Sequence, residues 1–550
     1  MIVGLLALVY LSYRQTISTY PNGGGSYTVA KTNLGTGAGL VAAAALMLDY
    51  VLVVAVGISA GIGALISVLP SLQPYTLPLC LAVLVIVTLV NLRGVRESGA
   101  AFIIPTYVFA ISLLTVVAIG LVKVLLGDTT PVDAPPLIPP VEGGATVSLW
   151  LLVRAFSSGC TAMTGVEAVS NGTPIFKASN AHNARITLGI IVGLLSVLLL
   201  GIAFLAKAYG VAATEPGSSG YESVLSQLVG AVIGKGFIYF ITLGAVISVL
   251  CLSANTGFAD FPRLCRVMAT EDYLPHAFAE RGRRLVFTAG AMTVAVSAGA
   301  LLIVFSGVTD RLIPLFAVGA FLAFTLSQLG MVVHWQHIGK KPVALMINLL
   351  FAIGTAAALV VMLASKFTES TWITLLLIPS AVLIFTGVKR HYESVATQIA
   401  SSQPLEVSDL EPPLVIVPIK NWDSIARKAL RFAMKLSPNV HAVHVQAGES
   451  PSDLEVNWDA RVVQPALAAQ KVAPKLIELP SPYRSLFGPL LGYIGGLENR
   501  QIAVIVPELV EHRPFHYWLH NQRATLLKAA LLFRNDRRIV VVNVPWYLED

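Results

Sequence analysis

The sequence predicts a multi-pass, all-α membrane protein that ends in a small α/β domain. Long apolar stretches fill residues 1–388, and charged residues make up only 12% of the 550 residues. From about residue 411, short apolar strands alternate with helical segments instead. A soluble domain carries about 25% charged residues. A chain with so few cannot cover its apolar surface with polar groups, so lipid must solvate it.

The first apolar stretch, MIVGLLALVYLS, reaches only to residue 12, where Tyr13 and Arg14 follow. A membrane-spanning helix needs about 20 apolar residues. We therefore expect a first helix that is truncated, with one more helix encoded upstream of Met1.

Ten longer apolar stretches follow, each long enough to span a bilayer, and with the truncated first one they make about 11 predicted helices. The longer ones lie at residues 37–69, 75–91, 99–122, 147–176, 186–206, 229–256, 285–307, 311–333, 343–365 and 370–388. Alternate loops are basic, as at Arg93 and at Lys340–Lys341, and the intervening loops are neutral or acidic. Basic loops stay in the cytoplasm, so this alternation places the C-terminal end there.

The C-terminal part carries a strand–helix alternation. Predicted strands lie at 414–419, 441–446, 475–479, 503–509 and 538–544. Strands that alternate with helices are typical of a parallel sheet. We predict a transmembrane transporter domain over residues 1–390, a polar linker over 391–411 and a cytoplasmic α/β domain with a regulatory or dimerisation role over 412–550.

Asp49 is the only ionisable residue of its predicted span, and the Tyr50 hydroxyl lies beside it. Ionisable groups inside a bilayer are costly and usually mark a transport pathway. The alternative is that Asp49 only bonds a neighbouring helix.

The predicted span 147–176 contains RAFSSGCTAMTGVEAVSNGTPIF, a run of small and hydroxyl residues with an acid, Glu167. Unwound backbone at membrane depth is tolerated where it lines a cavity, and transporters use such broken helices to bind ions. Ser158 and Thr164 are therefore candidate ligands and Glu167 a candidate proton-exchange group. The alternative is close helix packing through small residues.

Two features are candidates for closing the cytoplasmic side. Asp260 lies at a predicted cytoplasmic helix end, where Arg263 or Arg266 can pair with it, so we interpret it as a gate residue. The loop YPNGGGSY at 20–27 has glycines that allow close backbone approach.

Several classes of function find no support in the sequence. No Walker A, GxGxxG or HExxH motif is present, and the cysteines have no metal-binding spacing. The net charge of +7 arises from short loops between spans, which does not indicate nucleic-acid binding. We expect no enzymatic activity, no cofactor and no resident metal.

The glycine loop YPNGGGSY, the segments around Asp49, Glu167 and Asp260, and the stretch LIPLFAVGAFLAFTLSQLGM together resemble the amino acid–polyamine–organocation (APC) superfamily. Within it they resemble the KimA-type branch of potassium/proton symporters, which is related to KUP transporters. The resemblance implies a LeuT-type inverted-repeat fold, here lacking its first helix. It places Asp49, Tyr50, Ser158 and Thr164 at the ion site and Glu167 at the proton-coupling position. Phe316 stands where that branch carries a tyrosine.

We therefore expect proton-coupled potassium uptake across the plasma membrane. An amino acid or amine permease is the first alternative, because Val53 and Gly57 leave the Asp49 face poor in oxygen ligands. A non-transporting sensor or assembly subunit is the second.

The tail resembles universal stress proteins, without their ATP signature. Cations beside aromatic residues in HRPFHYWLHNQRA, namely Arg513, His520 and Arg523, are candidates for binding a regulatory cyclic dinucleotide. The alternative is a dimer contact or a packed helix start. We also expect a homodimer.

Overall fold

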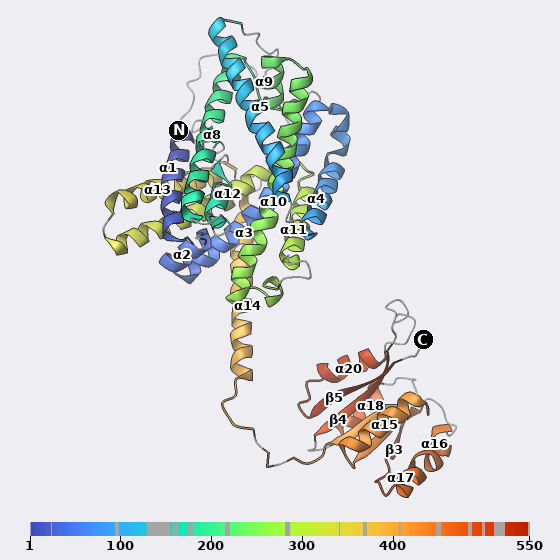
Figure 1. Cartoon of the computed structure of the whole chain (residues 1–550). Helices are drawn as coiled ribbons and strands as arrows, with labels where there is room; N and C mark the ends of the chain where they lie inside the picture. The colour runs from blue at the N-terminus through green and yellow to red at the C-terminus, as the bar shows by residue number, and fades with distance from the viewer. Residues whose placement is uncertain are drawn as a thin grey trace. The chain divides into compact units, whose positions relative to one another are not determined.

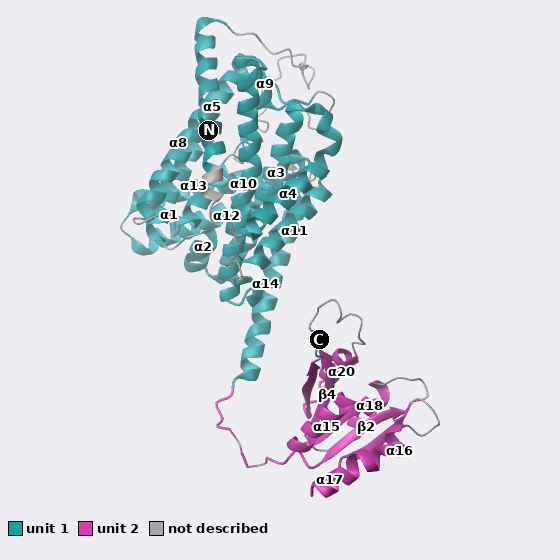
Figure 2. Cartoon of the chain, turned by 45° about the vertical axis from the view of Figure 1, so that its right-hand side comes forward, with its two compact units in different colours: residues 1–400 teal, residues 401–550 magenta. Residues whose placement is uncertain are grey.

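The fold is that of a computed structural model. It describes residues 2–21, 23, 25–93, 98–128, 155–156, 159, 163–173, 176, 180–214, 221–280, 287–339, 341–366, 371–405, 407–408, 410–446, 453–481, 487–497, 501–510 and 523–547. The chain divides into two units, Met1–Ala400 and Ser401–Asp550 (Figure 2).

The first unit is helical (Figure 1). Its helices are α1 (Ile2–Thr19), α2 (Ser26–Leu34), α3 (Thr36–Val68), α4 (Thr76–Leu92), α5 (Ser98–Leu126), α7 (Glu167–Asn171), α8 (Asn180–Ala208), α9 (Val224–Ile233), α10 (Phe237–Thr270), α11 (Thr288–Val304), α12 (Thr309–Ile338), α13 (Pro342–Lys366) and α14 (Trp372–Ile399). Among the described residues, eight helices are long and apolar enough to cross a membrane by length and composition: α3, α4 with the preceding turn Pro70–Tyr75, α5, α8, α10, α12, α13 and α14. The prediction of a multi-pass all-α membrane unit is confirmed.

Helix α1 extends beyond the apolar stretch that ends at residue 12 and runs on to Thr19, directly before the glycine loop. Tyr13 and Ile17 are buried on the side that faces the rest of the unit. The hydroxyls of Ser18 and Thr19 donate to backbone carbonyls one turn back, at 2.9 and 3.0 Å. Polar side chains that bond within the helix need no water, so they do not stop it.

Helices α3 and α12 form the centre of the unit. They have the most buried apolar windows of the eight, whereas α4 and α14 have the least. Glycines let the helices approach closely: a side chain at Gly257 of α10 would collide with the Tyr50 carbonyl of α3. Small residues at such contacts replace the hydrophobic driving force that is missing inside a bilayer.

The predicted span 229–256 is wrong as a single helix. It combines the end of α9 with the start of α10, and the chain turns between them at Gly234, whose φ is 75°. Helix α10 then continues to Thr270, so Arg263 and Arg266 are helical rather than in a loop. The sequence does mark this turn, because a charged residue lies between two glycines in the Gly-Lys-Gly segment at 234–236, and the prediction of one continuous span overlooked it.

The second unit is a three-layer α/β fold. Its strands are β1 (Leu414–Ile419), β2 (Val440–Gln446), β3 (Lys475–Pro480), β4 (Ile502–Val510) and β5 (Ile539–Tyr547), all parallel, in the order β3-β2-β1-β4-β5. Helices α15 (Ser424–Leu436) and α16 (Asp453–Trp458) contribute to the core on one face. Helices α18 (Phe487–Gly495) and α20 (Arg523–Phe533) contribute to the core on the other. The predicted parallel sheet is confirmed.

Candidate functional site

Asp49 lies in the middle of α3 and is completely buried. Neither of its carboxylate oxygens has a hydrogen-bond partner among the described residues. Gly319 of α12 comes close here, since a side chain at that position would lie 3.2 Å from the Ala45 carbonyl oxygen. An unpaired carboxylate held between two central helices is costly, so a cation or proton is the counterpart its chemistry requires.

Glu167 begins α7, a helix of only five residues. The described backbone of the predicted span 147–176 is interrupted just before it, where Gly165 has a φ of 89°. Gly165 donates its backbone N–H to the Glu167 carboxylate at 2.9 Å. Glycine adopts this left-handed conformation without strain, and the turn presents Glu167 to the interior.

The two acids belong to one cluster. Asp49 interacts electrostatically with Glu167, and the hydroxyls of Tyr13 and Tyr50 interact with both carboxylates. Asp49, Tyr50 and Glu167, three of the predicted site residues, therefore lie within electrostatic reach of one another. The structure adds Tyr13, which the sequence placed at the end of a span.

Asn171 is a further member that sequence reasoning missed. Its side-chain amide donates to the Tyr50 hydroxyl at 2.6 Å. The i, i+4 spacing from Glu167 places it on the same helical face, and that signal could have found it. The side-chain oxygen of Asn171, Oδ1, faces Gly25, where the Cβ of an added side chain would lie 2.7 Å from it. The glycine loop thus touches the cluster directly.

The cluster is rich in buried oxygens without hydrogen-bond partners among the described residues: Tyr13 Oη, Ser26 Oγ, Asp49 Oδ1 and Oδ2, Ser170 Oγ and Asn171 Oδ1. The Tyr13 and Ser26 hydroxyls are near each other but lack hydrogen-bond geometry. Buried polar groups are normally satisfied. A group of unsatisfied oxygens is the donor set that hard cations take.

A hollow of about 150 Å³ leads from this cluster toward the C-terminal end of α10. Gly25, Tyr50, Asn171, Asp260 and Arg263 are among the residues that line it. Asp260 pairs with Arg263 at 2.9 Å. The residue proposed as a gate therefore lines the same hollow as Tyr50 and Asn171.

Two ties hold the helix ends around this hollow. In the first, Glu271 accepts a hydrogen bond from the Tyr27 hydroxyl and pairs with Lys31 at 2.6 Å. This joins the glycine loop and α2 to the end of α10.

The second tie joins α10 to α14. Lys389 donates to the Glu271 carbonyl at 3.1 Å and to the Asp272 carboxylate at 3.3 Å. His276 bonds the other Asp272 oxygen at 2.9 Å and stacks on Tyr392. The hydrogen bond from His276, with the lysine beside it, lowers the pKa of Asp272 below its usual range.

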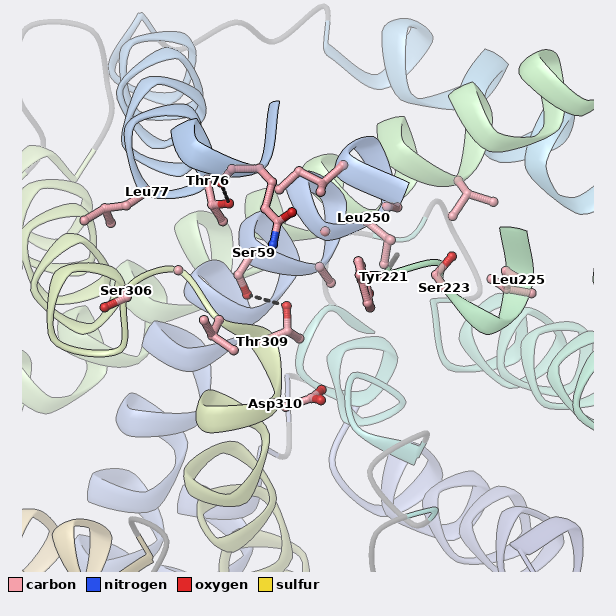
Figure 3. Close-up of a pocket in the computed structure, with 18 of the residues that line it drawn as sticks. Ser59, Thr76, Leu77, Tyr221, Ser223, Leu225, Leu250, Ser306, Thr309 and Asp310 are labelled. Carbon is pink, nitrogen blue, oxygen red and sulfur yellow. Dashed lines mark hydrogen bonds between the residues drawn. The ribbon is translucent and has the colours of Figure 1, made fainter. Parts of the chain in front are cut away.

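A larger hollow of about 570 Å³ lies where α3 ends and α12 begins (Figure 3). Thr309 donates to Ser59 at 3.1 Å across it, and Tyr221, Ser223 and Asp310 also line it. Burial, with Asp310 nearby, raises the pKa of Tyr221. Its lining comes from separate elements, so no local sequence signal marks it.

The other predicted site residues lie as follows. Thr164 is in the turn before Glu167. Phe316 is buried in an apolar cluster shared by α3, α10, α11 and α12. Ser158, Arg513 and His520 fall outside the described residues. Gly57 faces α10, where Ser253 would block a side chain, so its lack of an oxygen reflects helix packing.

Arg523 lines a hollow of about 270 Å³ in the second unit, with Lys420, Asn421 and Asp423. The hollow lies at the carboxyl ends of β1 and β4, where the order of strands reverses direction. Ligands of parallel α/β folds bind at such switch points.

A helical bundle with an interrupted segment and two buried acids, of which Asp49 has no hydrogen-bond partner among the described residues, defines a multi-pass membrane transporter. The chain belongs to the amino acid permease family of the APC superfamily, which it matches over residues 1–386. Residues 411–546 match the KimA potassium transporter C-terminal domain. The chain is 37% identical to the potassium transporter KimA of Bacillus subtilis (strain 168), over 99% of this chain and 88% of that relative. The resemblance stated from the motifs is confirmed.

Proposed function

We propose that this protein takes up potassium ions across the plasma membrane. The relative with 37% identity is named a potassium transporter, and the second unit matches a domain named after it. The observation that carries the proposal is the Asp49 carboxylate, buried without a hydrogen-bond partner among the described residues. Potassium is bound by oxygens, and the surrounding hydroxyl and amide oxygens supply them.

Asp49, Tyr50, Ser158 and Thr164 form the ion site in this proposal, beside Phe316. Asp260, paired with Arg263, controls the cytoplasmic passage. Glu167 carries the coupling proton, because it is buried within electrostatic reach of Asp49 and accepts a hydrogen bond from the Gly165 backbone N–H.

The test is uptake of labelled rubidium, as a potassium analogue, into proteoliposomes that hold the full chain. An inward proton gradient should accelerate wild-type uptake. With Glu167→Gln, uptake should lose its response to the gradient. Uptake of neither potassium nor rubidium by well-folded protein would reject the proposal.

An amino acid permease is the second candidate function, because the family matched by residues 1–386 is described by that activity. Labelled amino acids offered to the same proteoliposomes separate the two. Competition of an amino acid with rubidium would point to a shared site and to this second function.

We propose that the second unit is cytoplasmic and regulatory. The basic loops predict this side. Arg523 and Lys420 lie in a hollow at the switch point of its sheet, where they can hold the phosphates of a cyclic dinucleotide, with Arg513 and His520. Calorimetric titration of the full chain with a cyclic dinucleotide should show binding that Arg523→Gln weakens. Unchanged binding would reject this site.

A homodimer formed through the second unit stays a prediction. Helix α20 leaves Leu526, Leu532 and Phe533 exposed, the last at 88%. Light scattering of the detergent-solubilised chain checks the mass, and a monomer would contradict the proposal.

A further inference from the structure

Helix α15 carries a strongly basic outer face. Its inner side, with Ala426, Ala429 and Leu430, packs on the sheet. Its outer side consists of exposed residues: Ser424, Arg427, Lys428, Arg431, Phe432, Lys435 and Leu436. Helix α15 contains no acidic residue, whereas Asp453, Glu455 and Asp459 fall together on and just after α16.

The cations surround a shallow hollow of about 330 Å³. Phe432 and Trp546 form its apolar part. Lys428 donates to the Pro545 carbonyl at 2.6 Å and lies 5.5 Å from the Trp546 ring centre. Within the described chain, no acidic residue lines the hollow and Arg427, Arg431 and Lys435 have no ion-pair partner.

We propose that this α15 face binds the anionic headgroups of a phospholipid bilayer. Like charges held together on one helix repel each other, and an anionic surface removes that cost. A row of Lys and Arg with aromatic and aliphatic side chains between them is how amphipathic helices lie in a membrane interface. Phe432 and Leu436, 38% and 40% exposed, supply the apolar part.

A membrane is favoured over other polyanions because the second unit is joined by a short linker to the membrane-spanning unit of the same chain. Residues 400–413 separate α14 from β1, and such a segment extends at most about 50 Å. The tether keeps the unit at a high effective concentration near the cytoplasmic leaflet. This step rests on the proposed cytoplasmic placement.

The test uses vesicles added in trans. Its outcome therefore depends neither on the side of the membrane at which the second unit lies nor on transport. The full chain, in nanodiscs of phosphatidylcholine, is mixed with vesicles of phosphatidylcholine with or without phosphatidylglycerol, and co-flotation is measured. Wild-type protein should float with anionic vesicles and not with neutral ones. Each cation removed should weaken binding roughly five-fold, and added KCl should weaken it steeply.

The test variant replaces Arg427, Lys428, Arg431 and Lys435 by Gln. The matched control makes the same change at exposed cations elsewhere on the unit: Arg461, Lys471, Lys475 and Arg537. The α15 variant should lose co-flotation and the control should keep it. The KCl titration of the wild type tests the inference without any variant.

Several results would overturn the inference. Equal losses in both variants would mean that net charge alone attracts the unit. Equal binding to neutral vesicles, or binding insensitive to KCl, would exclude headgroup recognition. Displacement by inorganic phosphate at constant ionic strength would indicate a discrete anion site. Displacement by single-stranded RNA at a lower charge concentration than the vesicles would indicate a nucleic-acid surface.

Discussion

At the scale of single residues, the candidate site is defined by buried acids whose carboxylates accept few hydrogen bonds from the protein. The Asp49 carboxylate has no hydrogen-bond partner among the described residues, and the Glu167 carboxylate is bonded by backbone N–H groups of its own turn. A carboxylate that served only to join helices would be bonded across them. The Asp49 carboxylate is therefore free to meet a cation.

Asp49→Asn separates these two roles. If Asp49 binds the ion, the apparent potassium affinity in the rubidium assay should fall roughly 100-fold, since losing one partner of a buried charge pair costs about 3 kcal/mol. The thermal midpoint should not fall, because an amide is cheaper to bury unpaired than a carboxylate. Asp128→Asn, at an exposed position, is the control. A lower midpoint with normal uptake would show that Asp49 is a structural residue.

His441 in β2 provides a pH prediction. Partial burial, with Lys475 nearby, lowers the pKa of His441, whose ring bonds the Tyr493 hydroxyl at 2.7 Å. The unfolded chain binds the proton more readily, so His441 favours folding above its ordinary pKa of about 6.5, and that contribution is lost as the pH falls below it.

The measurement is limited proteolysis of residues 401–550 within the full chain at pH 7.5 and pH 5.5. These values are chosen to lie about one unit on either side of the ordinary pKa. Wild-type protein should be cleaved faster at the lower pH. His441→Gln, which keeps a hydrogen-bonding group, should reduce that difference, and an undiminished difference would assign it to other groups.

At the scale of elements, close helix packing positions the site. Gly57 of α3 and Gly257 of α10 bring the two backbones together beside Asp49 and Tyr50. The sequence indicates few oxygen ligands on the Asp49 face of α3, since Gly57 provides none. In the structure Gly57 packs against α10, so the absence of an oxygen there reflects helix packing. The oxygens come instead from α1, α2 and α7.

Gly257→Val should destabilise the membrane unit. Its side chain would meet the Tyr50 carbonyl at 2.5 Å and Val54 at 2.6 Å, and overpacking of this kind costs about 1–3 kcal/mol. Gly244→Val, on the same helix with nothing within 4 Å, is the matched control. Thermal unfolding in detergent measures both, and equal midpoints would mean that α3 and α10 can separate without cost.

At the scale of the whole molecule, the two units have separate cores, so their functions should separate as well. A chain that ends at Ala400 should insert and transport at a rate close to that of the full chain, and should lose any response to a cyclic dinucleotide. Rubidium uptake with and without the nucleotide measures both. A retained response would place the nucleotide site in the membrane unit.

Much of this organisation was predictable from the sequence. Apolar length and loop charge predicted the multi-pass unit, and the strand–helix alternation predicted the parallel sheet. The intramembrane acids Asp49 and Glu167 were visible because the bilayer makes such residues rare. These signals are local, and each can be detected within one segment of the chain.

Only the tertiary structure decided which groups meet. Tyr13, Ser26 and Asn171 have ordinary neighbours in sequence. They join the acids because α2 packs on α3, α7 is bonded to α3 through Asn171 and Tyr50, and α1 contacts α7. The hollow lined by Ser59, Tyr221 and Asp310 was equally invisible in the sequence. The physical reason is that solvation by lipid acts on each segment separately, whereas an oxygen cluster exists only where several helices pack.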